Sequence, residues 1–496
     1  MNRFNYKILP LIILLLVFFA SYSAIAIVNH QRFLTFGLDL GYFDETVWKI
    51  SQNKFPYSGV GCIWLLEDHF QPLLYLIAPL YHLYNSAGVL LIIQAFMMTL
   101  TGLPLYFISR KMSGSVFFSL SIVFAYLIFI GTQFSILNEF HQITLAPFFI
   151  ALFYWGIESR KKLALFSGLI PLFFIKEDLA LTIAAMGLGL FFRKKIRVFG
   201  SGLFVLGTAF FFLLIYLILP SISFKGIYAH FDFGKIGQTP IKIIANLITH
   251  PWQILQIFID SPLKLRTVFI SVFTFAFLPF LAPVYLLIPL MADFAMRFIY
   301  YGPQTTKWVL VNHHASVSAV FLALSSVAGA VRLRTMLGKS ANLYIALASA
   351  LIFTSLTADF ILRAPLHSLV KPQFYQQEKW IADNRKIISK VPPQASVAAQ
   401  NNLLPHLTHR DRVYRLPYGL NSEYIVMDLN DGPNKYAPLT FAQMQILFKE
   451  LTGNGRYSVA ERAGESYLLK RNYKTDIATG IYYGNRNYCY YSWEEF

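Results

Sequence analysis

Long apolar stretches separated by short basic clusters run along this chain up to about residue 360. The 496 residues are 56% hydrophobic and only 14% charged, with a mean hydropathy of +0.51. A chain of this composition folds as a helical protein that crosses a membrane several times. The basic clusters are Arg110-Lys111, Arg160-Lys161-Lys162, Arg193-Lys194-Lys195 with Arg197, and Arg332, Arg334 and Lys339.

The basic clusters predict the orientation of the chain in the membrane. Cytoplasmic loops are enriched in lysine and arginine, so we assign the clusters to the inside and the acidic turns between them to the outer face. Arg3 and Lys7 precede an apolar run from 8 to 28. A run of this length predicts a retained first helix with a cytoplasmic N-terminus. We therefore expect a multi-pass protein of the inner (plasma) membrane, in contact with membrane lipids.

Several function classes are not indicated. The net charge of +17 does not predict a nucleic-acid partner, because much of the excess lies in short loops between apolar segments. The two cysteines, Cys62 and Cys489, provide no zinc motif of the CxxC kind. Both are expected outside, where they could form a disulfide, but we expect two unpaired thiols. The sequence has no P-loop, GxGxxG, HExxH or GxSxG motif, so ATP-driven transport within this chain is unsupported.

We expect about eleven transmembrane helices. The first external loop, 29–71, contains a short amphipathic helix at 41–50. Residues 163–192 predict a hairpin of two short helices, because one long helix would place three charges at mid-bilayer. Residues 267–297 predict a second short pair, and residues 221–266 an external loop.

The composition changes after Asp359. We therefore divide the chain into a transmembrane domain, 1–360, and a small α/β domain, 361–496. Strands are predicted at 395–400 and 423–429, with a helix at 441–451. With an odd number of spans, this C-terminal domain is expected to be extracytoplasmic.

Three acids occupy the first external loop: Asp39, Asp44 and Glu45. A carboxylate beside an apolar surface has a raised pKa and can accept a proton from a hydroxyl nucleophile. Alternatively, Asp39 caps the helix that begins near Gly41, and Asp44 and Glu45 form its solvated face.

Further ionisable residues lie in the same loop and in the next external turn. They are Asp68 and His69, followed by Glu139 and His141. Such a set could bind a divalent cation or relay protons. They could equally be solvated loop groups, because no spacing typical of metal ligands is present.

Lys176, Glu177 and Asp178 interrupt a run that is otherwise apolar from Leu163 to Phe192. Ionisable residues embedded in this way are costly and usually serve a site. Lys176 could neutralise a phosphate, with an adjacent acid as its partner in the empty site. The alternative is a structural ion pair at a hairpin turn. Arg297 lies four residues after Asp293 and could likewise bind phosphate or form a simple helical pair.

Several segments quoted from the sequence resemble one family of predicted membrane proteins, called domain of unknown function 2079. The resemblance covers most of the chain and depends on the motifs in their order. They are GLDLGYFDETVW (37–48), EDHFQPLLYLIAPLYHLY (67–84), NEFHQITLAPFF (138–149), FIKEDLAL (174–181) and VPPQASVAAQNNLLPHLTHRDRVY (391–414).

That family is similar to the GT-C class of integral-membrane glycosyltransferases. The resemblance implies a helical membrane domain with one or two catalytic acids in its first external loop, where Asp39 and Asp44 lie. It also implies a donor sugar on polyprenyl phosphate and inversion at the anomeric carbon. The compact acidic motif of better-known members has only an approximate counterpart here, the pair Asp44-Glu45.

From these features we predict a glycosyltransferase that works on the outer face and transfers a sugar to an unknown acceptor. Asp44 or Asp39 would act as the base, Glu139 would orient the acceptor, and Lys176 and Arg297 would hold the phosphate. One alternative is a lipid or solute transporter or flippase with charges along a pathway. Another is a non-catalytic assembly protein whose C-terminal domain is the working part.

Overall fold

The computed structural model describes residues 8–224, 226, 228, 236–300, 305–338, 342–432 and 435–472. The chain forms two compact units that interleave in the sequence. Unit 1 contains residues 1–26, 66–73 and 91–371, and unit 2 contains residues 27–65, 74–90 and 372–496. Parts of the first loop therefore cluster with the C-terminal residues. The division into domains at residue 360 stays a prediction about which segments fold independently.

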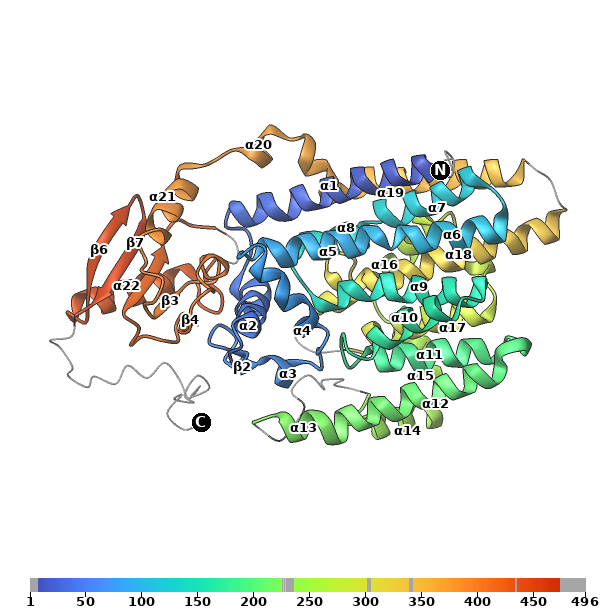
Figure 1. Ribbon diagram of the computed structural model, residues 1–496, viewed down its shortest axis with the longest axis horizontal. Helices are drawn as coiled ribbons and strands as arrows, with labels where there is room; N and C mark the ends of the chain where they lie inside the picture. Colours follow the sequence, from blue (N-terminus) through green and yellow to red (C-terminus); the bar gives the residue numbers. More distant parts are fainter. Residues whose placement is uncertain are drawn as a thin grey trace. The chain divides into compact units, whose positions relative to one another are not determined.

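Unit 1 is a bundle of helices (Figure 1). It contains most of α1 (Leu9–Gln31) and α5 (Gly88–Leu100), followed by α6 (Gly102–Ser113), α7 (Val116–Ile128), α8 (Ile130–Leu137), η4 (Gln142–Leu145), α9 (Ala146–Ser159), α10 (Lys162–Leu172), α11 (Leu179–Phe191), η5 (Lys194–Ile196), α12 (Arg197–Leu213), η6 (Leu214–Ile218), α13 (Leu219–Ile222), α14 (Pro240–Thr249), α15 (Trp252–Ile259), α16 (Pro262–Thr274), η7 (Leu278–Leu281), α17 (Val284–Phe298), η8 (Thr305–Trp308), η9 (His313–Ala315), α18 (Ser316–Leu337), α19 (Leu343–Leu362) and η10 (Pro365–Val370).

Five helical segments in the described part of the chain are long and apolar enough to cross a membrane, or six if the bent pair α7 and α8 forms one span. The five are Leu9–Gln31, Gly88–Ser113, Lys194–Ile222, His313–Leu337 and Leu343–Leu362. The predicted count of eleven is not confirmed, because helices such as α10 and α11 are shorter than a full span. The predicted hairpin is confirmed: α10 and α11 are separate helices joined by residues 173–178.

Residues 221–266 differ from the prediction of an external loop. The segment contains α14 and α15 and the start of α16. Pro240 and Pro262 each stand at the first position of a helix, where the missing N–H of proline has no intrahelical partner to lose. Apolar residues such as Ile241 and Leu255 are exposed on these helices, as expected of amphipathic helices that contact lipid.

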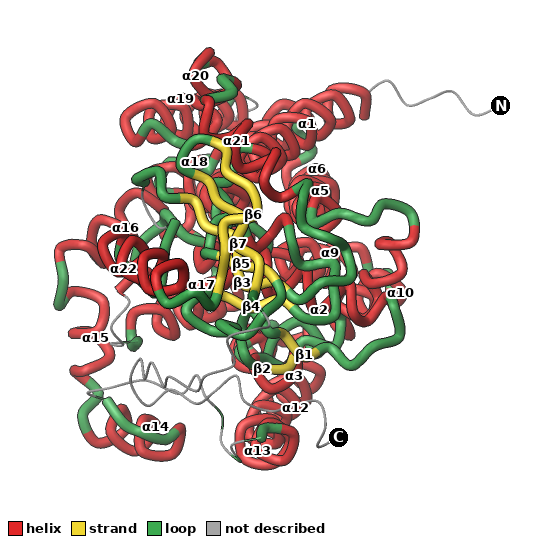
Figure 2. The backbone as a smooth tube through the Cα atoms, turned by 90° about the vertical axis from the view of Figure 1, so that its left-hand side faces the viewer, coloured by secondary structure: helices red, strands yellow, loops and turns green. Residues whose placement is uncertain are grey.

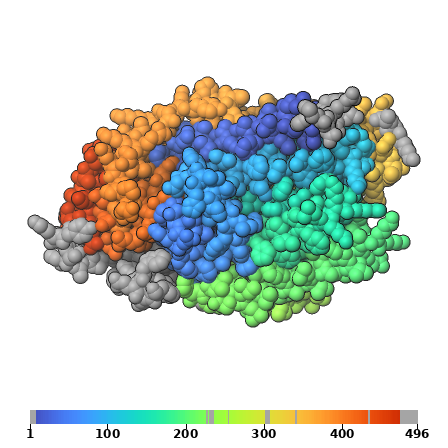
Figure 3. Space-filling model, in the orientation of Figure 1, coloured from blue at the N-terminus to red at the C-terminus, as the bar shows by residue number. Residues whose placement is uncertain are grey.

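The surface of unit 1 carries large apolar side chains on α12. Val205 and Leu206 are 62% and 52% exposed. The residues of α12 and α13, in green, form part of the face seen in Figure 3. Soluble proteins seldom expose so large an apolar surface, so this face of α12 is expected to contact lipid.

Unit 2 contains a five-stranded sheet with strand order β4-β3-β5-β7-β6 (Figure 2). The pairs β3–β4 and β3–β5 are parallel, and β5–β7 and β6–β7 are antiparallel. The described elements of this unit are η2 (Gly37–Gly41), α2 (Tyr42–Ser51), β1 (Tyr57–Ser58), β2 (Ile63–Trp64), α4 (Leu74–Ile77), η3 (Ala78–His82), α20 (Pro372–Tyr375), α21 (Lys379–Ile388), β3 (Val397–Ala399), η11 (Leu404–His406), β4 (Val413–Arg415), β5 (Tyr424–Asp428), α22 (Phe441–Gly453), β6 (Tyr457–Ala463) and β7 (Ser466–Arg471), while the residues of α3 (Leu65–Asp68) divide between the two units.

Alternate strand residues fill two cores, one on each face of the sheet. Val397 and Val426 pack with Ile381 of α21. Ile425 on the other face packs with Leu447 of α22. Phe33 and Val60 of the first loop belong to the α21 core, so the loop is part of the α/β structure. The small C-terminal α/β region is thus confirmed.

The first loop packs closely on the strands. A Cβ on Gly59 would lie 2.1 Å from the carbonyl oxygen of Val413, so only glycine fits there without movement of β4. Cys62 in the same loop is disulfide-bonded, which contradicts the expectation of two unpaired thiols. Cys489 lies outside the described residues.

Candidate functional site

The charged turn between α10 and α11 is a polar region of unit 1 with several hydrogen-bonded side chains. Glu177 is buried, and its carboxylate lies 2.8 Å from Nδ1 of His69. It also accepts hydrogen bonds from the backbone N–H of Phe70 at 3.0 Å and from the hydroxyl of Tyr228 at 2.5 Å. The turn is thereby tied to the segment that contains His69 and to the residues after α13.

The electrostatics of this turn favour charged side chains. Burial alone would raise the pKa of Glu177, but the His69 ring, its hydrogen bond and the Lys176 charge outweigh burial and hold this pKa below its usual value. Burial alone would lower the pKa of Lys176, but Asp178, Glu177 and Asp68 outweigh it and raise this pKa. The Nζ atom of Lys176 lies 3.4 Å from Asp178. Lys176 is therefore a cation at neutral pH.

Three histidine rings lie close together in unit 1. The rings of His141 and His313 are stacked with their centroids 3.4 Å apart, and the centroid of His314 lies 4.0 Å from that of His313. The positive charges of Lys176, Lys307 and Arg297 act on His314. His141, Lys176 and Arg297 therefore all act electrostatically on His314. Their role in substrate binding stays a prediction. His313 and His314 were not among the predicted site residues.

Glu139 lies in a turn with an unusual backbone. Its φ is +66°, a value uncommon for a residue other than glycine, and the residue is buried. The Gln94 side chain holds this turn, because its amide group donates to the Glu139 carbonyl and its oxygen accepts from the His141 N–H at 2.9 Å. Strained backbone of this kind is concentrated at functional sites.

Arg297 is buried in α17 and uses its guanidinium to hold a neighbouring segment. It donates to the carbonyls of Lys307 and Val309, each at 2.9 Å, and to the hydroxyl of Ser318 at 3.0 Å. Asp293 lies 4.0 Å away, as the four-residue spacing predicts. Three of the five N–H groups of Arg297 thus already have partners. A role of Arg297 in phosphate binding stays a prediction.

Asp44 is fully buried in unit 2 and is enclosed by three polar side chains. One oxygen accepts a hydrogen bond from Tyr81 at 2.6 Å. The other accepts from the Thr408 hydroxyl and lies 3.0 Å from Nε2 of His409. His409 is 20% exposed and stacks on Trp48, with the ring centroids 5.5 Å apart.

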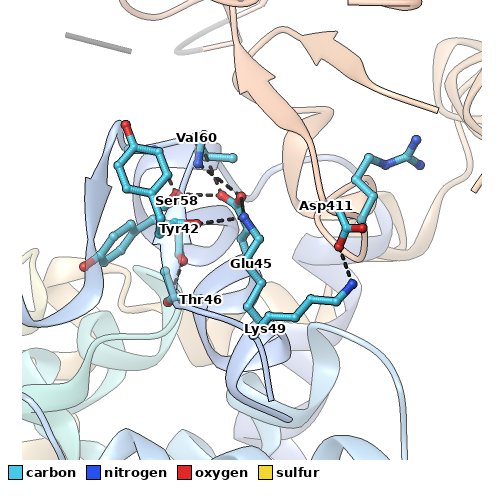
Figure 4. Close-up of polar contacts among 12 residues, drawn as sticks. Tyr42, Glu45, Thr46, Lys49, Ser58, Val60 and Asp411 are labelled. Atoms are coloured by element: carbon cyan, nitrogen blue, oxygen red, sulfur yellow. Dashed lines mark hydrogen bonds and ion pairs between the residues drawn. The ribbon is translucent and has the colours of Figure 1, made fainter. Parts of the chain in front are cut away.

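Glu45 is also fully buried, with all its partners in one loop (Figure 4). It accepts from Lys49 Nζ at 2.7 Å, from the Ser58 hydroxyl at 2.6 Å and from the backbone N–H groups of Gly59 and Val60. Four donors saturate this carboxylate, which favours a positioning role. The alternative that Asp44 and Glu45 form a solvated helix face does not agree with their burial.

The predicted site residues divide between the two units. Asp39, half-buried in η2, lies with Asp44 and Glu45 in unit 2. The remaining predicted residues belong to unit 1: Asp68, His69, Glu139, His141, Lys176, Glu177, Asp178 and Arg297. Sequence reasoning missed Tyr228, Gln94 and His409. Of these three, only His409 lay in a segment singled out beforehand, the family motif at 391–414.

The sequence does not decide whether the protein binds a divalent cation. Within the described ranges, no group of three or more histidine, cysteine, aspartate or glutamate side chains is arranged to hold a metal ion.

Comparisons with known proteins give a family and a fold. The model of the family described as predicted membrane protein (DUF2079) matches residues 29–468. No curated protein matches the sequence. The solved structure of apo ArnT from Cupriavidus metallidurans is similar over 90% of this chain and 96% of its own, with a TM-score of 0.50 and 12% identity. ArnT from the same organism bound to undecaprenyl phosphate gives a TM-score of 0.48 with 11% identity, over 93% and 98% of the two chains.

Proposed function

Because this chain belongs to the DUF2079 family of predicted membrane proteins and shares its fold with ArnT, we propose that it is a membrane glycosyltransferase of the GT-C type. The donor would be a sugar on polyprenyl phosphate, and the acceptor hydroxyl would displace the phosphate with inversion. The protein would lie in the inner membrane, with the reaction on the outer face and the α/β region outside the cytoplasm. The fold likeness supports the transferase class, and the donor is proposed from the chemistry of the site.

The observation that carries this proposal is the cationic Lys176, next to the buried Glu177 in a turn between apolar helices. Its charge is maintained by Asp178, Glu177 and Asp68. A preorganised cation stabilises the negative charge that develops on a departing phosphate. Asp178 pairs with the lysine, and a phosphate oxygen would replace that exposed partner.

The base would be Asp44 or Asp39, as the first-loop acids predict. As the acceptor oxygen bonds to the anomeric carbon, the bond from that carbon to the phosphate oxygen breaks, and the hydroxyl proton passes to the carboxylate. Asp44 is buried, so a proton would reach it through His409, which lies 3.0 Å from it. Asp39 is half-buried and would accept the proton directly.

The experiment measures transfer of a radiolabelled sugar from a polyprenyl-phosphate donor to acceptors in membranes containing the full chain. We expect Lys176→Met to lower turnover by about 10²-fold or more, through loss of charge stabilisation. Asp→Asn at the true base should lower it by about 10²–10⁴-fold. Lys162→Gln is the matched control, because Lys162 is an exposed lysine at the start of α10.

Near-normal turnover in both Asp39→Asn and Asp44→Asn would exclude the first-loop acids as bases. Near-normal turnover in Lys176→Met would show that Lys176 does not bind the departing phosphate. Each variant is first shown to unfold at the temperature of the wild type, so that loss of turnover reports chemistry.

A further inference from the structure

A cavity of about 400 Å³ lies in unit 2 beside the end of α2. It is lined by Lys49, Lys54, Phe55, Asp411 and Arg412. Its volume falls within the range of pockets that hold small ligands, roughly 300–1,000 Å³. Figure 4 shows two of its lining residues, Lys49 and Asp411, with the Glu45 contacts at the base of the first loop.

The walls of the cavity are fixed before any ligand arrives. Glu45 binds Lys49 and the backbone of residues 59 and 60, which holds the first-loop wall. Gly37 donates to the carbonyl of Asn401 at 2.8 Å, which links the same loop to the segment before η11. Lys54 and Asp411, which both line the cavity, form an ion pair. A preformed cavity binds a ligand without a large ordering cost.

The lining residues combine an aromatic face with charged groups. Phe55 is 47% exposed and stacks on Trp64, with the ring centroids 5.3 Å apart. The carboxylate of Asp411 is exposed and can accept hydrogen bonds from hydroxyl groups. The Arg412 guanidinium is exposed and has no side-chain hydrogen bond or ion pair with any residue that the structure describes. The charges of Lys49 and Lys54 are matched by Glu45 and Asp411.

This set fits a sugar ring that carries a negative charge. The apolar face of a pyranose can lie on an aromatic ring, its hydroxyls can donate to a carboxylate, and a carboxylate or phosphate substituent can pair with a free guanidinium. We propose that the cavity binds the acceptor, and that the acceptor is an anionic saccharide. The identification of this saccharide as the acceptor rests on the proposed function. Binding of the saccharide itself can be measured without turnover.

Binding is measured by isothermal titration calorimetry on the full chain in nanodiscs of phosphatidylcholine, without a donor. The probes are digalacturonate, a neutral disaccharide of the same size and inorganic phosphate. We expect saturable binding of digalacturonate, with the neutral disaccharide and phosphate at least about tenfold weaker, because hydrogen bonds to charged groups exceed neutral ones. Equal binding of the neutral sugar would overturn the anionic class. Equal binding of phosphate, or no binding of digalacturonate, would overturn the saccharide site.

Substitutions of lining residues test whether digalacturonate binds in this cavity. Arg412→Gln and Phe55→Ala should each weaken digalacturonate binding by about tenfold or more. Lys386→Gln, at an exposed residue of α21 outside the cavity, should leave it unchanged. Unaltered affinity in Arg412→Gln would place the ligand elsewhere. If digalacturonate binds but no sugar transfer occurs, the proposed function is wrong and the saccharide site stands. If sugar transfer occurs without digalacturonate binding, only this inference is wrong.

Discussion

Buried carboxylates in this protein differ in the number and exposure of their hydrogen-bonding partners. Glu45 and Glu177 each have three or more partners, drawn from neighbouring loop segments. Such acids organise the surrounding chain. Asp44 differs, because one of its partners is the partly exposed His409, which gives the carboxylate a route to solvent. Neighbouring acids in the sequence therefore support different roles.

The substitution Glu45→Gln tests the positioning role. It removes the charge that faces Lys49, whose side chain is only 3% exposed, and leaves a buried cation without its counter-ion. We expect a loss of about 3–5 kcal/mol in the free energy of unfolding. Thermal unfolding of the full chain in detergent measures it. Glu465→Gln, in an exposed pair with Arg462, is the control and should cost no more than about 1 kcal/mol.

At the scale of helices, close backbone packing depends on glycine. On the contact between α11 and α12, a Cβ on Gly187 would lie 2.3 Å from the backbone nitrogen of Phe204. A Cβ on Gly207 would lie 2.6 Å from that of Ala184. Small residues let membrane helices approach closely, so these glycines set the spacing of the pair. The charged turn ahead of α11 depends on that spacing.

The change Gly207→Leu should separate α11 from α12, because backbone cannot yield as a flexible side chain can. We expect a destabilisation of about 1–3 kcal/mol, or more if the helices part. Gly202→Leu on the same helix is the control, since a Cβ there meets nothing within 4 Å. Unfolding followed by circular dichroism compares the two, and equal stabilities would contradict the role of the glycine contact.

Local signals predicted most elements but not their contacts. The α10–α11 hairpin follows from three charges that an apolar helix could not hold. The α/β region follows from strand-like segments that alternate with a helical one. The helices α14 and α15 were missed within the predicted external loop, although Pro240 stands at the position where helices begin. Tyr228 was missed as a partner of Glu177 because a contact across 51 residues has no signature in one sequence.

For the whole molecule, the distribution of lysine and arginine predicts which residues lie on each side of the membrane. We expect the N-terminus in the cytoplasm and the α/β region outside. A periplasmic-activated phosphatase fused after residue 496 should therefore be active, and the same reporter fused after Lys195 should be inactive. The reverse result would contradict the assignment and, with it, the outer-face reaction. Equal expression of both fusions is the control.

The contact between Asp44 and Thr408 has a consequence for synthesis. The two residues are 364 positions apart. At a translation rate of about 5–20 residues per second, Asp44 would be complete roughly 20–70 s before its partner leaves the ribosome. During that time Asp44 lacks Thr408 and His409, two of the three side chains that enclose it. The nascent chain therefore passes through a period in which chaperones have access to this part of the loop.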